Sequence, residues 1–198
     1  MSTATAIADF WNLFARVSSK LAHLTSADDP DYDQLLKQLH RVDPGLFLEL
    51  AADPEHSELV ITADGNSDLF SLADMVVEAA PQTDGWEIVA LKPKLGFPES
   101  VSWEGVSVNI EDVVFDPSSP DESDELVLRL LVPGITEQEV DSAHNALLRA
   151  LDNALGEREF AANVQYTEVE PLTEPADDYI PLLNLEEFLK WHNKKRGH

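Results

Sequence analysis

The sequence contains no cysteine among its 198 residues. Disulfides, thiolate metal sites and thiol catalysis are therefore excluded. Its eight glycines are dispersed, and no GxGxxG, GxxxxGK or GxSxG run occurs. Phosphate-cradling loops and a nucleophile elbow are thus not expected. No stretch approaches the length of a membrane span, and the first six residues carry no basic charge before an apolar run. A cytoplasmic protein without a membrane partner is expected.

Basic residues are scarce, since 13 Lys and Arg stand against 38 Asp and Glu and give a formal net charge of -25. A charge of this size repels nucleic acid and anionic membranes, so neither is expected as a partner. It suits a protein that binds a basic partner or mimics a polyanion. Solubility, or adaptation to a saline cytoplasm, would account for the same composition. The hydrophobic fraction of 43% predicts a folded chain.

The first 45 residues predict an N-terminal helical segment. Apolar residues recur at helical spacing through residues 6–24, and three of them are aromatic. This stripe predicts a face that packs on the rest of the protein, with a partner-binding face as the alternative. A proline near the first turn and a leucine-rich run at 32–39 predict a second, shorter helix.

Residues 46–95 predict a strand-strand-helix-strand unit. Two apolar runs around an Asp-Pro turn indicate a hairpin, and a helix follows them. The stretch Trp86–Leu91 is apolar on both faces, with Glu87 as the only break in that pattern. A strand of this kind is typical of the inside of a sheet, so it is expected to be a central strand.

Residues 96–170 predict a second unit with the same order of elements. Residues 113–115 and 126–132 indicate the hairpin, and a capping box opens a helix over 136–156. Alternation of apolar and polar residues over 160–167 predicts the last strand. The shared order indicates either a duplication or convergence on a common supersecondary pattern.

Together these segments predict an α+β fold with a mainly antiparallel sheet and helices chiefly on one face. Residues 171–198 are expected to form an extended acidic tail and then a helix over 183–192. All four segments are expected to form one compact domain, and the oligomeric state is left open.

The six histidines show neither an HExxH motif nor close spacing, so no metal and no cofactor is expected. His144 flanks the buried stripe of the strongest helix, where it could serve as a base or ligand. A partly buried structural histidine is the favoured interpretation. The acidic run Asp116–Glu125 offers oxygens that calcium prefers, but it lacks the ligand spacing and central glycine of an EF-hand. A solvated connection is predicted there.

Lys92 and Lys94 are the only cations in residues 42–128, which hold 20 carboxylates. Two-residue spacing along a strand would place both lysines on one face. Ion pairing with nearby carboxylates is the first expectation. The alternative is a recognition patch in which Phe97 and Trp103 join the lysines as apolar anchors.

The runs LVITADG and GWEIVALKPKLGFP, with a helix that begins at DLF between them, resemble a family of uncharacterised acidic bacterial proteins. A similar strand, helix and W-x-x-x-A-x-K-P strand recur in that family. The match covers about residues 43–117, and its motifs are structural, with no catalytic signature. Related acidic domains occur alongside ribonuclease-regulator modules, so the resemblance implies a protein-binding inhibitory role.

These observations predict a non-enzymatic interaction protein, namely an inhibitor, immunity-type or regulatory module that binds a basic protein surface. The alternative is an enzyme or small-ligand-binding protein whose site is assembled from scattered Asp, Glu and His residues. A deep pocket in which carboxylates converge with His144 would favour the alternative. A shallow acidic surface would favour protein binding.

Overall fold

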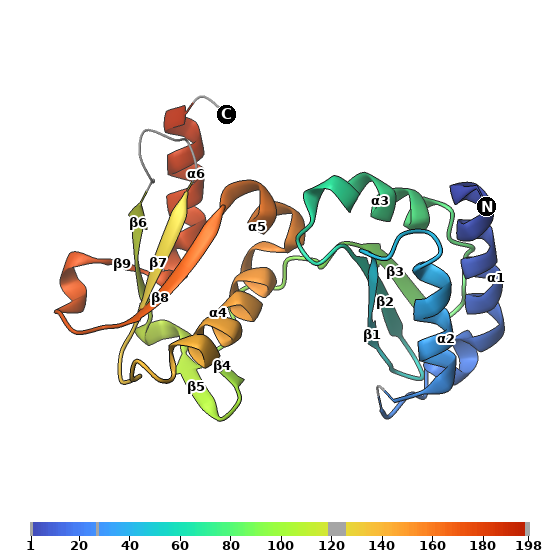
Figure 1. Cartoon of the computed structure of the whole chain (residues 1–198), viewed down its shortest axis with the longest axis horizontal. Coiled ribbons are helices and arrows are strands. Elements are labelled where there is room, and N and C mark those ends of the chain that lie inside the picture. Colours follow the sequence, from blue (N-terminus) through green and yellow to red (C-terminus); the bar gives the residue numbers. More distant parts are fainter. Residues whose placement is uncertain (1, 27, 119–125, 197–198) are drawn as a thin grey trace. The chain divides into compact units, whose positions relative to one another are not determined.

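The computed structural model describes residues 2–26, 28–118 and 126–196, and it divides into two compact units, Met1–Pro93 and Lys94–His198 (Figure 1). The expected division at residue 95 lies close to this boundary. The expected single compact domain is replaced by two units, each with its own sheet and buried residues. Helices and open mixed sheets occur in both units, which confirms the α+β class.

The first unit begins with two helices, α1 (Thr3–Leu21) and α2 (Pro30–Leu39). The Ser2 hydroxyl accepts a hydrogen bond from the first turn of α1, and the Asp29 carboxylate does the same for α2, so both helices are capped by side chains. The apolar stripe of α1 is buried, as the packing interpretation predicts. Its buried members are Ile7, Phe10, Trp11, Leu13, Phe14, Val17 and Leu21.

The sheet of the first unit has the order β1-β2-β3. β1 (Phe47–Ala51) and β2 (Ser57–Thr62) form the predicted antiparallel hairpin. A 3-10 turn at Ser67–Leu69 leads into α3 (Phe70–Glu78), and β3 (Trp86–Ala90) then pairs in parallel with β2. The central strand is therefore β2, and the expectation that β3 is central is wrong. Helices cover one face of this sheet (Figure 1).

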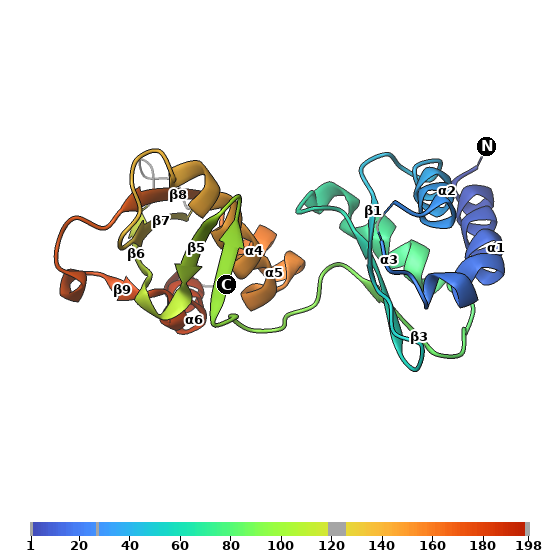
Figure 2. The same ribbon diagram turned by 90° about the horizontal axis from the view of Figure 1, so that it is seen from below.

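The second unit opens with the hairpin of β4 (Ser100–Trp103) and β5 (Val106–Asn109), which packs against the helix α4 (Val140–Leu155) (Figure 2). β6 (Val114–Ser118) and β7 (Val127–Val132) then form a second hairpin, as predicted. α4 (Val140–Leu155) follows β7, and a buried cluster between β7 and α4 forms the core of this unit.

The C-terminal part differs from the sequence pattern at one place. Residues predicted as a strand from 160 to 167 instead begin as the helix α5 (Glu157–Asn163), and β8 (Tyr166–Pro171) starts later. Gly156 ends α4 with a φ of 74°, a conformation that glycine adopts without strain, and the chain turns there into α5. Of the alternating apolar residues in 160–167, Val164 packs into the core from the end of α5.

One more strand, β9, completes the second sheet, whose order is β8-β7-β6-β9. The acidic tail ends in the short strand β9 (Ile180–Pro181), which pairs with β6, and α6 (Leu185–Arg196) follows. Further 3-10 turns lie at Ile110–Asp112, Ala176–Asp178 and Leu182–Asn184. Among the described residues, no helix combines the length and apolarity needed to cross a membrane.

Both units share one topology, in which a hairpin is followed by a helix and then by a strand parallel to the second strand of the hairpin. The elements are β1-β2-α3-β3 in the first unit and β6-β7-α4-β8 in the second, where α5 is added before β8. The predicted order of elements is thus found in both units. The units form separate mixed sheets, so the expectation of one shared sheet is wrong.

Candidate functional site

The two lysines of the predicted patch do not continue β3. The strand ends at Ala90, and Leu91 has a φ of 64°, which lies in the left-handed region. This turn breaks the two-residue alternation, so the expectation that Lys92 and Lys94 share a strand face is wrong. The boundary between the units also falls between Pro93 and Lys94.

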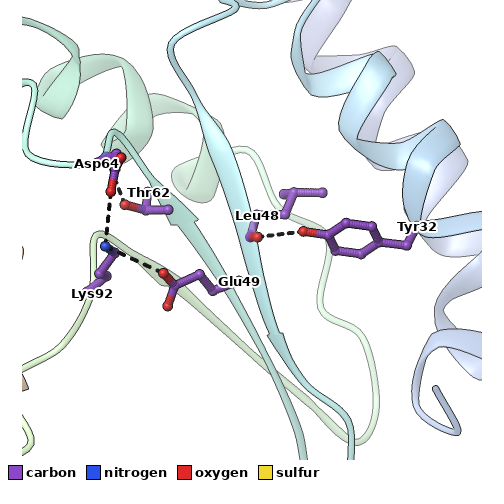
Figure 3. A network of polar contacts seen from close by, with 6 residues as sticks. All are labelled: Tyr32, Leu48, Glu49, Thr62, Asp64 and Lys92. Carbon is purple, nitrogen blue, oxygen red and sulfur yellow. Dashed lines mark hydrogen bonds and ion pairs between the residues drawn. The ribbon is translucent and has the colours of Figure 1, made fainter. Parts of the chain in front are cut away.

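Lys92 follows β3 and contacts one carboxylate on β1 and another just after β2, so its contacts link all three strands of the first sheet (Figure 3). Its Nζ lies 3.2 Å from Asp64 Oδ1, after β2, and 3.5 Å from Glu49 Oε1 on β1. The backbone N–H of Asp64 also donates to Thr62 Oγ1 at 3.0 Å. Only 17% of the Lys92 side chain is exposed, so its charge is compensated within the first unit.

Lys94 is held by helices of the second unit. Its Nζ lies 2.7 Å from Glu186 Oε2 on α6 and 3.9 Å from Glu159 Oε2 on α5. The hydrogen bond to Glu186 raises the pKa of Lys94 above its usual value. The backbone N–H groups of residues 95 and 96 both donate to the Asn153 carbonyl on α4. The expectation of intramolecular pairing is therefore confirmed for both lysines.

The two aromatic residues of the predicted patch both belong to the second unit. Phe97 is half-buried against the hydrophobic core. Trp103 is 37% exposed on β4, and the Arg149 guanidinium carbon lies 5.6 Å from its ring centroid. The structure therefore gives each of the four residues a partner inside its own unit. A recognition role for them stays a prediction.

His144 has a structural environment. Its Nε2 lies 2.7 Å from Oγ1 of Thr167, a residue on β8 that is 5% exposed. Burial lowers the pKa of His144 below its usual value, and nearby Asp141 partly opposes that shift. Among the residues that the structure describes, no group of three or more His, Asp or Glu side chains could hold a metal ion. This arrangement supports the structural interpretation of His144.

The acidic connection predicted as a solvated segment lies mostly outside the described residues, because only 116–118 of that run are described. At its start, Asp116 on β6 pairs with Arg129 on β7, and the two are direct cross-strand partners. The Arg129 guanidinium also lies 3.7 Å from Glu170 on β8. A cation thus stands between acidic side chains across the second sheet.

One face of the first sheet carries the exposed carboxylates of Glu49 and Glu87 and the half-buried Glu58, around the buried Val60. We call it the acidic sheet face and define it by Phe47, Glu49, Glu58 and Glu87. Phe47 is 40% exposed, and the Glu49 and Glu87 side chains are 55% and 56% exposed. These residues share one face because Glu49 lies opposite Val60, two positions from Glu58, on the neighbouring strand.

Glu58 and Glu87 are direct partners in the parallel pairing of β2 with β3. Like charges placed opposite each other destabilise a sheet. Glu87 is 3.2 Å from His56 Nε2, whereas Glu58 makes no ion pair within the described part of the chain. In the second sheet, the corresponding row is Asp116, Arg129 and Glu168, so a cation separates the acids. Arg129 therefore separates the acidic side chains in the second sheet, whereas Glu58 and Glu87 are adjacent in the first.

The acidic sheet face was not predicted from the sequence. The one feature of the sequence that hints at this face is Glu87, the single charged residue in an otherwise apolar strand. The pairing of Glu87 with Glu58 depends on the register of β2 and β3, which the sequence alone does not reveal.

A scan against protein-family models, a search of curated proteins and a search of solved structures each found no match. The resemblance to acidic bacterial proteins therefore stays a prediction. Any functional conclusion depends on the site geometry itself.

Proposed function

We propose that this chain is a non-enzymatic interaction protein that binds a basic protein surface, as an inhibitor, immunity-type or regulatory module. The observation that carries the proposal is the direct pairing of the half-buried Glu58 with the exposed Glu87 on one face of the first sheet. A partner Lys or Arg inserted between these carboxylates would remove their repulsion. Binding would then recover free energy that the folded protein alone does not gain.

The surroundings of these two carboxylates suit a protein partner. Phe47 provides an exposed apolar side chain on the same face, and apolar anchors within a polar rim are typical of protein interfaces. The net charge of -25 would attract a basic protein over several ångströms and speed association. Among the described residues no group of three or more His, Asp or Glu side chains could hold a metal ion, and His144 contacts Thr167 with Asp141 nearby, so no observation favours the enzyme alternative.

The partner can be sought by affinity capture from the native cell with the full-length protein as bait. The proposal predicts a basic protein that elutes at moderate salt, because surface ion pairs are screened within about 10 Å at 0.1 M ionic strength. A bait carrying Glu58→Gln and Glu87→Gln should lose this protein. Capture that survives high salt and both substitutions would overturn the proposal.

A further inference from the structure

A groove with a volume of about 840 Å³ lies between α1 and α2. The two helices are joined at one end by the ion pair of Lys20 with Asp31, whose Nζ and Oδ2 are 2.9 Å apart. Three cations line the groove, with Arg16 on α1, Lys37 on α2 and Arg41 just after α2. This groove belongs entirely to the first unit and is separate from the acidic sheet face.

The concentration of positive charge here is unexpected for this chain. Residues 1–93 contain only five Lys and Arg against sixteen Asp and Glu. The other two cations of this unit, Lys20 and Lys92, are both paired with carboxylates. The side chains of Arg16, Lys37 and Arg41 make no ion pair or hydrogen bond within the described residues, although carboxylates are abundant. Three exposed cations that have no such partner among the described residues therefore line one groove.

Neutral hydrogen-bond donors line the groove in addition to the three cations. The Nε2 atom of Gln38, a residue that lines the groove, is buried and has no hydrogen-bond partner among the described residues. A buried donor without an acceptor costs free energy, so a shift of the Gln38 side chain that let an anion in the groove accept from Nε2 would be favourable. The Asn12 amide adds another donor group. Asp9 is the only carboxylate among the lining residues, and it is outnumbered by the three cations.

Helix electrostatics account for only part of this arrangement. Lys37 lies in the last turn of α2 and Arg41 just beyond it, where the helix dipole favours cations. Arg16 lies inside α1, away from either end of that helix, so the dipole does not explain its place. The dipole does not account for the buried Gln38 donor either.

We infer that the groove between α1 and α2 binds a small phosphate-bearing anion. A dianionic phosphate offers several acceptor oxygens to two arginines and a lysine at once, and Arg forks match phosphate geometry. Leu13 is the only large apolar side chain in the lining, and no aromatic ring is present there, which disfavours a nucleotide base or an apolar ligand. The volume lies in the range of about 300–1,000 Å³ typical of small-molecule sites.

The test uses the full-length protein, isotope-labelled for amide NMR, and titrates it with inorganic phosphate at constant ionic strength set with chloride. Glycerol phosphate is titrated in parallel, to distinguish a phosphate ester from the free ion as the preferred form. The proposal predicts saturable shifts at residues 9–16 and 34–41. Absence of saturation, or equal shifts with chloride alone, would overturn it.

Variants locate the site. Arg16→Gln with Arg41→Gln should weaken phosphate binding by about tenfold or more, because charge-assisted hydrogen bonds are lost. Lys194→Gln with Lys195→Gln removes the same charge from exposed residues of the second unit and should leave the affinity unchanged. Equal weakening by both pairs would contradict the proposed site.

A second variant separates binding from folding. Gln38→Met keeps the side-chain size but removes the buried donor, so phosphate affinity should fall while the melting temperature stays at or above that of the unmodified protein. A lower melting temperature with unchanged phosphate affinity would contradict the role of Gln38.

Discussion

Lys92 and Lys94 are separated by a single proline, yet their ammonium groups bind carboxylates in different units. Lys92 contacts Asp64 at 3.2 Å in the first unit, and Lys94 contacts Glu186 at 2.7 Å in the second. The two lysines therefore lie on opposite sides of the boundary between the units. Each lysine fixes the chain to the sheet or helices of its own unit.

Lys92→Gln should lower the free energy of unfolding by up to about 1 kcal/mol, because the lysine is largely shielded and has two carboxylate partners. Lys94→Gln should have a smaller effect, since 40% of its side chain is exposed and water screens the pair. Urea denaturation of both variants measures the difference. An unchanged stability together with lost partner binding would instead support the recognition patch.

Trp11→Phe should destabilise the protein by about 1–3 kcal/mol, because it leaves a buried carbonyl without its donor. The indole N–H of Trp11 donates to the Val76 carbonyl at 2.8 Å and so joins α1 to α3. Trp191→Phe is the matched control, since Trp191 is 52% exposed. Denaturant midpoints that shift equally in both variants would refute this role for the buried hydrogen bond.

Because of His144, we expect the free energy of unfolding to decrease as the pH falls below about 6.5. Burial lowers the pKa of His144 in the folded state, so the unfolded chain binds the proton more readily between the folded pKa and the usual value of 6.5. The stabilisation is present above pH 6.5 and is lost as the pH falls through the folded pKa. His144→Gln should show a smaller loss of melting temperature between pH 7.5 and pH 5.5.

The control for that experiment is His23→Gln, because His23 is exposed on the surface of the first unit. It should keep the pH dependence of the unmodified protein. An NMR titration that placed the His144 pKa above 6.5 would contradict the assigned effect of burial.

Periodicity predicted the helices well, because an apolar stripe at 3.6-residue spacing, such as the one in α1, is typical of a helix with one buried face. It failed at residues 160–167, where the alternation resembled a strand but helix α5 ends with Val164 packed in the core. The order of elements in both units was also predictable. Their separation into two sheets was not, because a pattern of buried faces does not specify which strands become neighbours.

The candidate sites were less predictable than the fold for the same reason. Glu58 and Glu87 lie far apart in the sequence and meet only through the parallel register of β2 and β3. Arg16 and Arg41 line the same groove only because α1 and α2 lie side by side. Lys92 and Lys94 were visible as rare cations, and their pairing with carboxylates followed from charge alone.

The most direct test of the proposed function measures the affinity of the captured basic partner for three forms of this protein by isothermal titration calorimetry. The forms are the unmodified protein, the Glu58→Gln, Glu87→Gln variant and a control with Glu137→Gln and Glu168→Gln. The control residues are exposed in the second unit, so both variants lose two negative charges. We predict affinity reduced by about tenfold or more, with weaker salt dependence, only for the first variant. Equal affinity for all three forms would contradict the proposed role of the acidic sheet face.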